Sequence, residues 1–261
     1  ALACLLRLRR DRVTQVMQDC LWYGGGPLRR AWMRFCLRHV AACVVWASVE
    51  CTRYARAYGV DPAKFVFVPH HHTLGRYQFE VGDGGYIFCG GNADRDFGLL
   101  FEALRGLPYP CKLATNRPGL LHGLAIPAMV ERLSLTPAEF RNCMAGARLV
   151  VMPMRATLLH AGAQQSILNA MVMAKPVVLT DPEGGRDYIV EEESARTGFL
   201  VPYPDPAALR AVIIRLWEDP GLRRAVGERA RAAAAALTTE ECNRKIWELA
   251  AACAQHRPAR S

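Results

Sequence analysis

The sequence predicts an α/β protein, most of it a doubly wound parallel sheet with helices on both faces. From residue 86 onward, short apolar runs of β type alternate with segments of helical periodicity. This alternation is typical of parallel strands joined by helical crossovers. The runs are apolar throughout, which fits strands buried on both faces of a sheet. With 261 residues and 51% hydrophobic content, the chain has material for one large domain or two modest ones.

The strands and helices of this region can be placed in order. Thr136 and Glu139 form a capping box, and Asp205 precedes a proline at the first position of another helix. The alanine-rich stretch 229–237 is a strong helix former. We expect strands at 86–91, 111–115, 148–153, 176–180 and 197–201, with helices over 97–104, 137–146, 164–174 and 206–216 and a last helix from 238 or 239.

The part before residue 70 repeats the pattern in a shorter form. A basic amphipathic helix (28–39) is followed by a strand (42–48), a helix (48–58) and a second strand (64–69). The stretch 70–85 is rich in glycine and polar residues and has neither periodicity, so it is expected to be a linker. The first sheet has too few strands for a complete doubly wound domain. We therefore expect the beginning of that domain to be missing.

Positive charge is concentrated in the first quarter of the chain. The net charge is +9, and residues 1–60 contain ten arginines against three acidic residues. Between residues 7 and 38 the arginines alternate with apolar and aromatic residues. This pattern suits an anionic membrane surface, a phosphorylated acceptor or simply a solvated helix face. No nucleic-acid recognition motif accompanies the charge, so nucleic acid is not expected as a partner.

The cysteines and apolar runs indicate the compartment. The ten cysteines are scattered without a CxxC pair, and Cys43 and Cys89 lie inside apolar runs, as buried reduced thiols of a cytoplasmic protein do. The longest uncharged apolar run, 40–49, is too short to span a bilayer. The first residues are too short and too basic a run for a secretory signal. We expect a cytoplasmic protein that meets the inner face of a membrane only peripherally.

The stretch 160–181 carries the strongest chemical signal. Gly162 and Ala163 lead into a helix N-terminus, and a buried strand follows the helix. The free N–H groups of residues 163–166 and the helix dipole favour a phosphate there, and Gln165 and Ser166 can add side-chain hydrogen bonds. An ordinary turn between strand and helix would produce the same pattern. The residues alone do not decide between the two interpretations.

This stretch resembles the donor site of family 4 (group 1) glycosyltransferases, retaining enzymes of the GT-B fold with two Rossmann-like domains. The family pattern is a glycine-containing turn, a helix ending in Glu-Ala-x-Ala-x-Gly-x-Pro-Val-Val, and a Gly-Gly loop. Here the matching residues are 169–178 and Gly184-Gly185. The likeness continues through 197–209 and back to Gly90-Gly91 and 58–69. No single motif is decisive, but their order and spacing are specific when taken together.

The resemblance implies three parts in the chain. Residues 1–75 would be the C-terminal part of the acceptor-side domain, an incomplete Rossmann-like domain; residues 76–237 would bind the nucleotide sugar; and residues 238–261 would form a C-terminal helix. The residues expected to bind the donor diphosphate and sugar are Gly91, Arg95, Gly162, Ala163, Gln164, Gln165, Ser166, Asn169, Gly184 and Gly185, with His160 and His72 as candidates for the cleft.

Two positions depart from the family pattern. The family has two glutamates in this region, of which the second holds the donor ribose and the first contacts the transferred sugar. Those positions are Asn169 and Ala161 here. Asn169 can still form hydrogen bonds, without the charge of a carboxylate, whereas Ala161 contributes no polar group. The catalytic residues are therefore unassigned. His160 either occupies part of that space or is a surface histidine without a role.

Three other motifs have a functional and a plain interpretation. Arg95, in GGNADRD (90–96), either neutralises the diphosphate or pairs on the surface with Asp94 or Asp96. The loop 183–186 either contacts the sugar or is a turn. The adjacent histidines 70–72 cannot readily converge on one ion, so no metal is expected. The glycines do not match GxGxxG and no P-loop motif occurs, which disfavours a dinucleotide or other cofactor.

The expected function is transfer of a sugar from a nucleoside diphosphate sugar, such as a UDP or GDP sugar, to a saccharide or lipid-linked acceptor, with retention. Two alternatives share the fold. One is a catalytically impaired protein that binds nucleotide sugars or acts as a scaffold, which the missing glutamates would suit. The other is a sugar-nucleotide epimerase.

Overall fold

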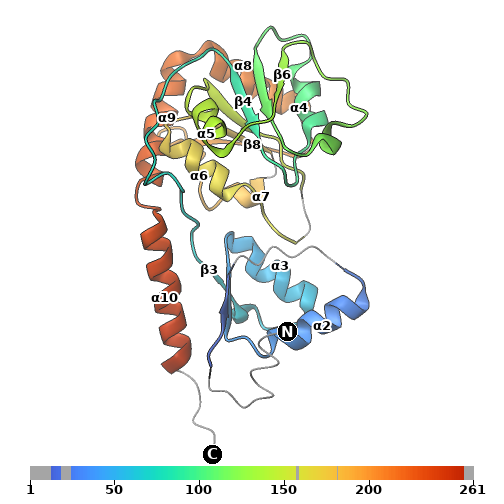
Figure 1. The fold of residues 1–261 in the computed structure, drawn as a ribbon, viewed down its shortest axis with the longest axis vertical. Helices are drawn as coiled ribbons and strands as arrows, with labels where there is room; N and C mark the ends of the chain where they lie inside the picture. The colour runs from blue at the N-terminus through green and yellow to red at the C-terminus, as the bar shows by residue number, and fades with distance from the viewer. Residues whose placement is uncertain (1–12, 19–24, 157–158, 181, 256–261) are drawn as a thin grey trace, which may run out of the picture. The chain divides into compact units, whose positions relative to one another are not determined.

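The chain divides into two compact units, each with its own parallel sheet (Figure 1). The computed structural model describes residues 13–18, 25–156, 159–180 and 182–255. The first unit comprises residues 1–71, 157–161 and 239–261, and the second comprises residues 72–156 and 162–238.

The second unit contains a six-stranded parallel sheet in the order β6-β5-β4-β7-β8-β9. The strand order reverses between β4 and β7, which defines a doubly wound sheet with a topological switch point. The central strands β4, β7 and β8 are buried at every residue, as the continuous apolar runs predict. The strands are β4 (Ile87–Gly90), β5 (Cys111–Ala114), β6 (Val130–Leu133), β7 (Leu149–Met152), β8 (Val177–Thr180) and β9 (Gly198–Val201).

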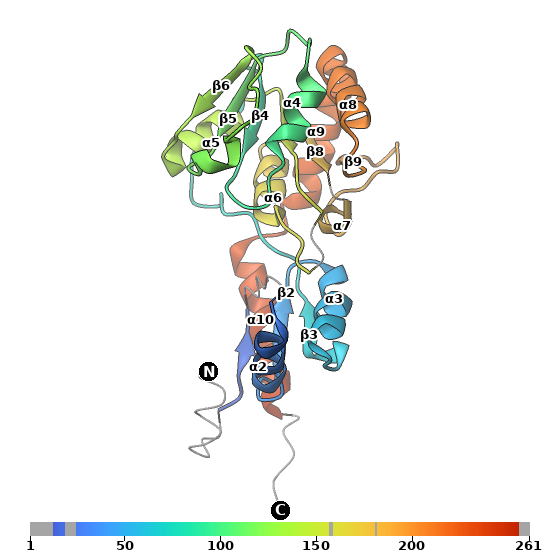
Figure 2. The same ribbon diagram turned by 90° about the vertical axis from the view of Figure 1, so that its right-hand side faces the viewer.

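Helices cover both faces of this sheet (Figures 1 and 2). On one face, α4 and α8 share a hydrophobic core with the strands. On the other face, Phe140 of α5 makes an edge contact with Phe88 of β4, at 5.0 Å between ring centroids. The helices are α4 (Phe97–Leu104), α5 (Pro137–Ala145), α6 (Gln164–Val172), α7 (Pro182–Gly185), α8 (Pro206–Glu218) and α9 (Pro220–Ala234), with a 3-10 turn at Pro118–Leu121.

The capping signals predicted from the sequence are present. The Thr136 hydroxyl accepts from the Glu139 N–H, and the Glu139 carboxylate accepts from the Thr136 N–H in return. Asp205 accepts from the Ala208 N–H at 2.8 Å at the start of α8. These bonds satisfy N–H groups that the first turn of each helix leaves without a partner, so the helix starts are encoded locally.

Strand β6 and the segment after β8 differ from the sequence-based expectation. Strand β6 was not predicted, because its central residues Glu131 and Arg132 are exposed at the sheet edge and leave no apolar run. The predicted glycine-rich loop after β8 is instead the single helical turn α7. Both segments are too short for periodicity to identify them.

Helix α9 packs very closely against the end of α6. An added Cβ on Gly227 of α9 would lie 2.1 Å from the carbonyl oxygen of Ala174, so only glycine fits at this crossing. Ala174 itself has a positive φ of 54° just beyond α6. This contact fixes the C-terminal end of α6 within the second unit.

The first unit is built on a three-stranded parallel sheet in the order β1-β2-β3. Its residues Val44 and Trp46 share a small core with Cys242 of α10, so the last long helix packs on this sheet. No helix in the described ranges is both long and apolar enough to cross a membrane. The elements are β1 (Val16–Met17), α2 (Pro27–Leu37), β2 (Ala42–Val45), α3 (Ser48–Tyr58), a 3-10 turn (Pro62–Lys64), β3 (Phe65–Phe67) and α10 (Thr239–Gln255).

Candidate functional site

The candidate site lies at the carboxyl ends of β4 and β7, where the strand order of the second sheet reverses. The loop after β4 and the loop after β7 are joined by backbone hydrogen bonds. The Asp96 N–H donates to the Pro153 carbonyl at 2.6 Å, and the Arg155 N–H donates to the Asp94 carbonyl at 2.8 Å. In open parallel sheets ligands bind beyond such strand ends, at the switch point. The two loops therefore form one connected rim at the expected position.

Gly91 begins the loop after β4, at a position that leaves no room for a side chain. Its φ is +132°, a backbone conformation that favours glycine. An added Cβ would also lie 2.6 Å from the Arg95 Nη2 atom. The glycine predicted for this loop is therefore explained by the close approach of Arg95.

Arg95 lies underneath this loop rather than on the surface. Arg95 is only 5% exposed. Its Nε donates to the Gly90 carbonyl and its Nη1 to the Ala93 carbonyl, each at 3.1 Å. Nη1 also contacts the Met154 Sδ atom. Burial lowers the pKa of the guanidinium. The expectation of a surface ion pair is wrong, because the guanidinium is held by backbone carbonyls. Direct contact of Arg95 with a diphosphate stays a prediction.

An exposed cation on the same rim was missed by the sequence analysis. Arg155 follows β7, is largely exposed, and places its Nε 3.8 Å from a carboxylate oxygen of Asp96. The same carboxylate caps α4 by accepting from the Leu99 N–H, and it accepts from the Tyr203 hydroxyl at 2.9 Å. A signal was available, since Arg155 comes two residues after the predicted strand 148–153. Arg155 thus joins the candidates for binding an anion.

Helix α6 begins with an uncapped N-terminus. Ala163 has φ +75°, a left-handed conformation that is uncommon for alanine and that is often found at functional sites. The first helical hydrogen bond runs from the Ile167 N–H to the Ala163 carbonyl at 2.8 Å, so the N–H groups of residues 164–166 have no helical partner. Within the described chain, no side chain caps this end. Its partial positive charge is available for an anion.

Gln164, the first residue of α6, adds a second observation. Its side chain is 5% exposed, and its amide nitrogen Nε2 is buried without a hydrogen-bond acceptor among the residues that the structure describes. A buried amide donor without a partner costs about 1–3 kcal/mol, so such groups usually await a ligand or water. Gln165 is exposed, whereas Gly162 and Ser166 are half-buried.

Asn169 lies one turn further along α6 and is already hydrogen-bonded. Its Oδ1 accepts from the Thr73 N–H at 2.9 Å, and its Nδ2 donates to the Thr73 hydroxyl at 3.1 Å. Both residues belong to the second unit. Thr73 was not predicted to take part, because it is 96 positions away in the sequence. A ribose bound by Asn169 would have to share or replace these bonds.

The two glycines after β8 have a packing role. Gly184 and Gly185 are buried in α7, and an added Cβ on Gly185 would lie 2.6 Å from both Leu179 of β8 and Leu200 of β9. The tight contact with these two strands accounts for Gly185 without a ligand. Contact of this turn with a sugar stays a prediction.

Ala161 and His160 belong to the segment that clusters with the first unit. The Ala161 N–H donates to the Glu50 carboxylate of α3 at 2.8 Å, and both His160 and Glu50 are buried. Burial raises the pKa of Glu50, while the backbone bonds and the nearby His160 act in the opposite direction. The resembled family has a glutamate at the position of Ala161. Here the Glu50 carboxylate of α3 instead accepts a hydrogen bond from the backbone N–H of Ala161.

The three histidines 70–72 each contact a different residue. His70 stacks on Trp46, with 4.5 Å between ring centroids, and His71 Nδ1 lies 3.0 Å from the Thr239 hydroxyl. His72 is buried in the second unit and its Nδ1 accepts from the Leu74 N–H. Among the described residues, no group of three His, Cys, Asp or Glu side chains is arranged to hold a metal ion.

Comparisons with known proteins find a family match for part of the chain. Residues 119–219 match the family described as glycosyl transferases group 1. A comparison with curated proteins finds no match.

Three solved structures illustrate the likeness of fold. Sucrose-phosphate synthase from Thermosynechococcus elongatus superimposes with a TM-score of 0.75 at 18% identity, over 94% of this chain and 69% of that one. Anabaena Alr3699/HepE, solved with UDP and glucose, gives a TM-score of 0.75 at 16% identity, over 95% and 74%. WaaG, a glycosyltransferase of lipopolysaccharide biosynthesis, gives 0.66 at 18% identity, over 95% and 80%. At these identities the likeness establishes the fold.

The doubly wound sheet with its connected rim at the switch point defines a Rossmann-like α/β protein whose ligand site lies at the carboxyl ends of the strands. Within this class, residues 119–219 match the group 1 glycosyltransferases, and the chain has the GT-B fold of the neighbours named above.

Proposed function

We propose that the chain is a glycosyltransferase that takes its sugar from a nucleoside diphosphate sugar and transfers it with retention, as in family 4, to a saccharide or lipid-linked acceptor. The observation that carries the proposal is the buried amide of Gln164 at the first residue of α6, for which the described part of the chain offers neither an acceptor nor a side-chain cap. An anionic diphosphate would accept hydrogen bonds from this amide and from the N–H groups of residues 164–166.

Other residues of the second unit would complete the donor site. Arg155 offers an exposed guanidinium on the rim beside Asp96, and Arg95 adds a buried positive charge beneath the same loop. Asn169 would orient the ribose by exchanging its bonds with Thr73 for bonds to hydroxyl groups. In this proposal the leaving diphosphate is stabilised by N–H groups and arginines, so the reaction needs neither a metal nor a cofactor. The Anabaena neighbour, solved with UDP and glucose, supports a nucleotide sugar as donor.

Calorimetry with UDP-, GDP- and ADP-glucose tests the donor site. Replacing Gln164 with leucine removes the buried amide but keeps similar volume, so we expect donor affinity to fall about tenfold while stability is unchanged or higher. Gln78→Leu is the matched control, because Gln78 is an exposed amide in the same unit, outside the site. Equal affinity of Gln164→Leu and the wild type would count against the proposed site.

A non-catalytic nucleotide-sugar-binding or scaffold protein is the second candidate function. Two observations favour it: Asn169 is engaged by Thr73, and position 161 offers only a backbone N–H that Glu50 already accepts. Release of free nucleotide from bound donor, measured with and without added saccharide acceptors, separates the candidates. Nucleotide release supports transfer, and tight binding without release supports the scaffold. An epimerised donor formed without acceptor would point to an epimerase instead.

We also propose that the protein works in the cytoplasm, peripherally attached to an anionic membrane through α2. Leu28, Trp32 and Phe35 follow one another at helical spacing and are 87%, 53% and 45% exposed. An exposed apolar stripe among arginines is typical of helices that lie in a membrane interface. The basic residues are Arg29, Arg30, Arg34 and Arg38, all in the stretch 7–38; Arg7, Arg9, Arg10 and Arg12 lie outside the described residues.

Co-sedimentation with vesicles tests this attachment. Replacing Trp32 with serine should lower binding to phosphatidylglycerol vesicles several-fold, because an aromatic anchor is lost. Trp247→Ser on α10 is the control, since Trp247 is 75% exposed but is not part of α2. Binding that is unaffected by Trp32→Ser, or equally affected by both changes, would contradict attachment through α2.

A further inference from the structure

Helix α3 presents two faces of different chemistry. One face is buried in the first unit through Tyr54, Ala55 and Tyr58. The opposite face carries residues at positions 49, 52, 53, 56 and 57, which recur every three to four residues and therefore lie on one side of the helix. This second face is not used by the proposed donor site, which belongs to the other unit.

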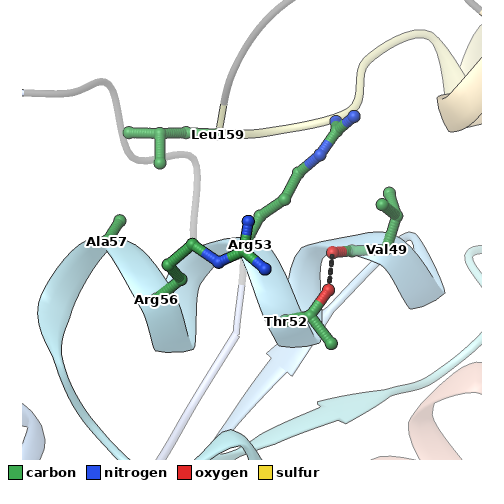
Figure 3. Close-up of a pocket in the computed structure, with 6 residues that line it drawn as sticks. All are labelled: Val49, Thr52, Arg53, Arg56, Ala57 and Leu159. Carbon is green, nitrogen blue, oxygen red and sulfur yellow. Dashed lines mark hydrogen bonds between the residues drawn. The ribbon is translucent and has the colours of Figure 1, made fainter.

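A hollow of about 400 Å³ lies over this second face (Figure 3). Its opposite wall includes Leu159, which precedes the buried pair His160 and Ala161. The Ala161 N–H donates to Glu50 on the same helix at 2.8 Å, so the segment carrying Leu159 is anchored to α3. The volume lies within the range of pockets that hold small ligands. The lining residues are Val49, Thr52, Arg53, Arg56, Ala57 and Leu159.

The charge of the hollow is positive. Arg53 and Arg56 lie one turn apart on α3; Figure 3 shows Arg56 lying alongside the helix and Arg53 rising from it toward the ribbon that continues from Leu159. Of the described residues that line it, none is acidic. Glu50, the acid of this helix, is turned away, because its carboxylate accepts from the backbone N–H groups of Trp46, Ala47 and Ala161.

Two guanidinium groups beside small apolar side chains suit one kind of ligand. Arginine binds phosphate through paired N–H donors, which a neutral sugar cannot match in charge. Val49, Ala57 and Leu159 offer apolar surface for the part that bears the phosphate. The Thr52 hydroxyl already donates to the Val49 carbonyl at 3.1 Å, so the arginines supply the donors for an anion.

We propose that the hollow over α3 binds the phosphate group of a phosphorylated acceptor, with Arg53 and Arg56 as its ligands. This rests on the proposed transfer reaction, because it names the acceptor class for that reaction. The phosphate can belong to a soluble sugar phosphate or to a lipid headgroup, and the two arms of the test distinguish these sources.

The test measures binding directly on the full chain. In the first arm, calorimetry with glucose 6-phosphate and inorganic phosphate is compared with calorimetry with glucose. In the second arm, co-sedimentation with phosphatidic acid vesicles is compared with phosphatidylcholine vesicles. Arg56→Ala should weaken binding of the phosphorylated probe about tenfold, since one charge-assisted contact is lost. Arg53→Ala should act in the same direction.

Arg244→Ala is the matched control, because it removes an exposed arginine from α10 in the same unit. Arg56 is exposed, so its replacement leaves folding intact even if Arg53→Ala lowers stability. Failure of every phosphorylated probe to bind, or an equal loss in Arg56→Ala and Arg244→Ala, would overturn the proposal. UDP-glucose binding is measured in parallel. Its loss in Gln164→Leu concerns the donor site alone, so the two proposals fail separately.

Discussion

Glu50 connects helix α3 to the segment around Ala161, and its replacement by alanine should have a large effect. The carboxylate accepts from the N–H groups of Trp46 and Ala47 at 3.1 Å each, and from the Ala161 N–H at 2.8 Å. Loss of a helix N-terminal acceptor costs about 0.5–2 kcal/mol, and a buried N–H left without a partner costs about 1–3 kcal/mol. Because the buried carboxylate also carries a desolvation cost, we expect a net loss of about 2–4 kcal/mol.

The pH dependence of this effect has a definite sign. Burial raises the pKa of Glu50 above 4.5, so the folded state holds the proton more tightly than the unfolded state. The stability contributed by Glu50 is therefore largest below pH 4.5 and falls as the pH rises through the folded pKa. The difference in the free energy of unfolding between the wild type and Glu50→Ala should therefore become smaller as the pH rises over this range.

Urea unfolding together with native-state hydrogen exchange measures both effects. The amides of Trp46, Ala47 and Ala161 should lose protection in Glu50→Ala while amides of the second sheet keep theirs. Glu248→Ala is the control, since Glu248 forms an exposed ion pair with Arg244 whose loss should stay within about 0.5 kcal/mol. An unchanged exchange rate at Ala161 together with unchanged stability would refute this reasoning.

Two further predictions concern the second unit. Burial lowers the pKa of Lys175 to about 8, although its Nζ donates to the Gly82 and Ala147 carbonyls. The unfolded state therefore binds more protons than the folded state between about pH 8 and 10.5, and the free energy of unfolding of the wild type should rise by about 1–2 kcal/mol across this window. Lys175→Met should abolish this rise, which urea unfolding at several pH values measures. Gly227→Ala places a Cβ 2.1 Å from the Ala174 carbonyl and should cost more than about 2 kcal/mol, whereas an unchanged thermal midpoint would contradict the close packing of α9.

Much of the second unit could be predicted because its signals are local. The strands are continuous apolar runs, and the helix starts at Thr136 and Asp205 are set by side chains within three residues of the N–H groups that they cap. The uncapped start of α6 was also predicted from its small residues. Edge strand β6 could not be predicted, because exposed Glu131 and Arg132 interrupt its apolar pattern.

The contacts that shape the sites depend on residues far apart in the sequence. Glu50 reaches Ala161 across 111 positions, and Thr73 reaches Asn169 across 96. The sequence left Arg95 between a diphosphate ligand and a surface ion pair, and only the tertiary structure shows that the residue is buried in contact with Met154 of the loop after β7. The hollow over α3 likewise needs Leu159 as its second wall.

The sequence by itself therefore determined the α/β class, the position of helix α6 with its small-residue start and the basic first quarter of the chain. These depend on hydrophobic periodicity and on short-range hydrogen bonds, which neighbouring residues encode. The tertiary structure decided which polar groups are already satisfied and which, such as the Gln164 amide, remain to meet a ligand. Burial and hydrogen-bond pairing depend on the packing of distant segments, and this packing exists only once the chain has folded.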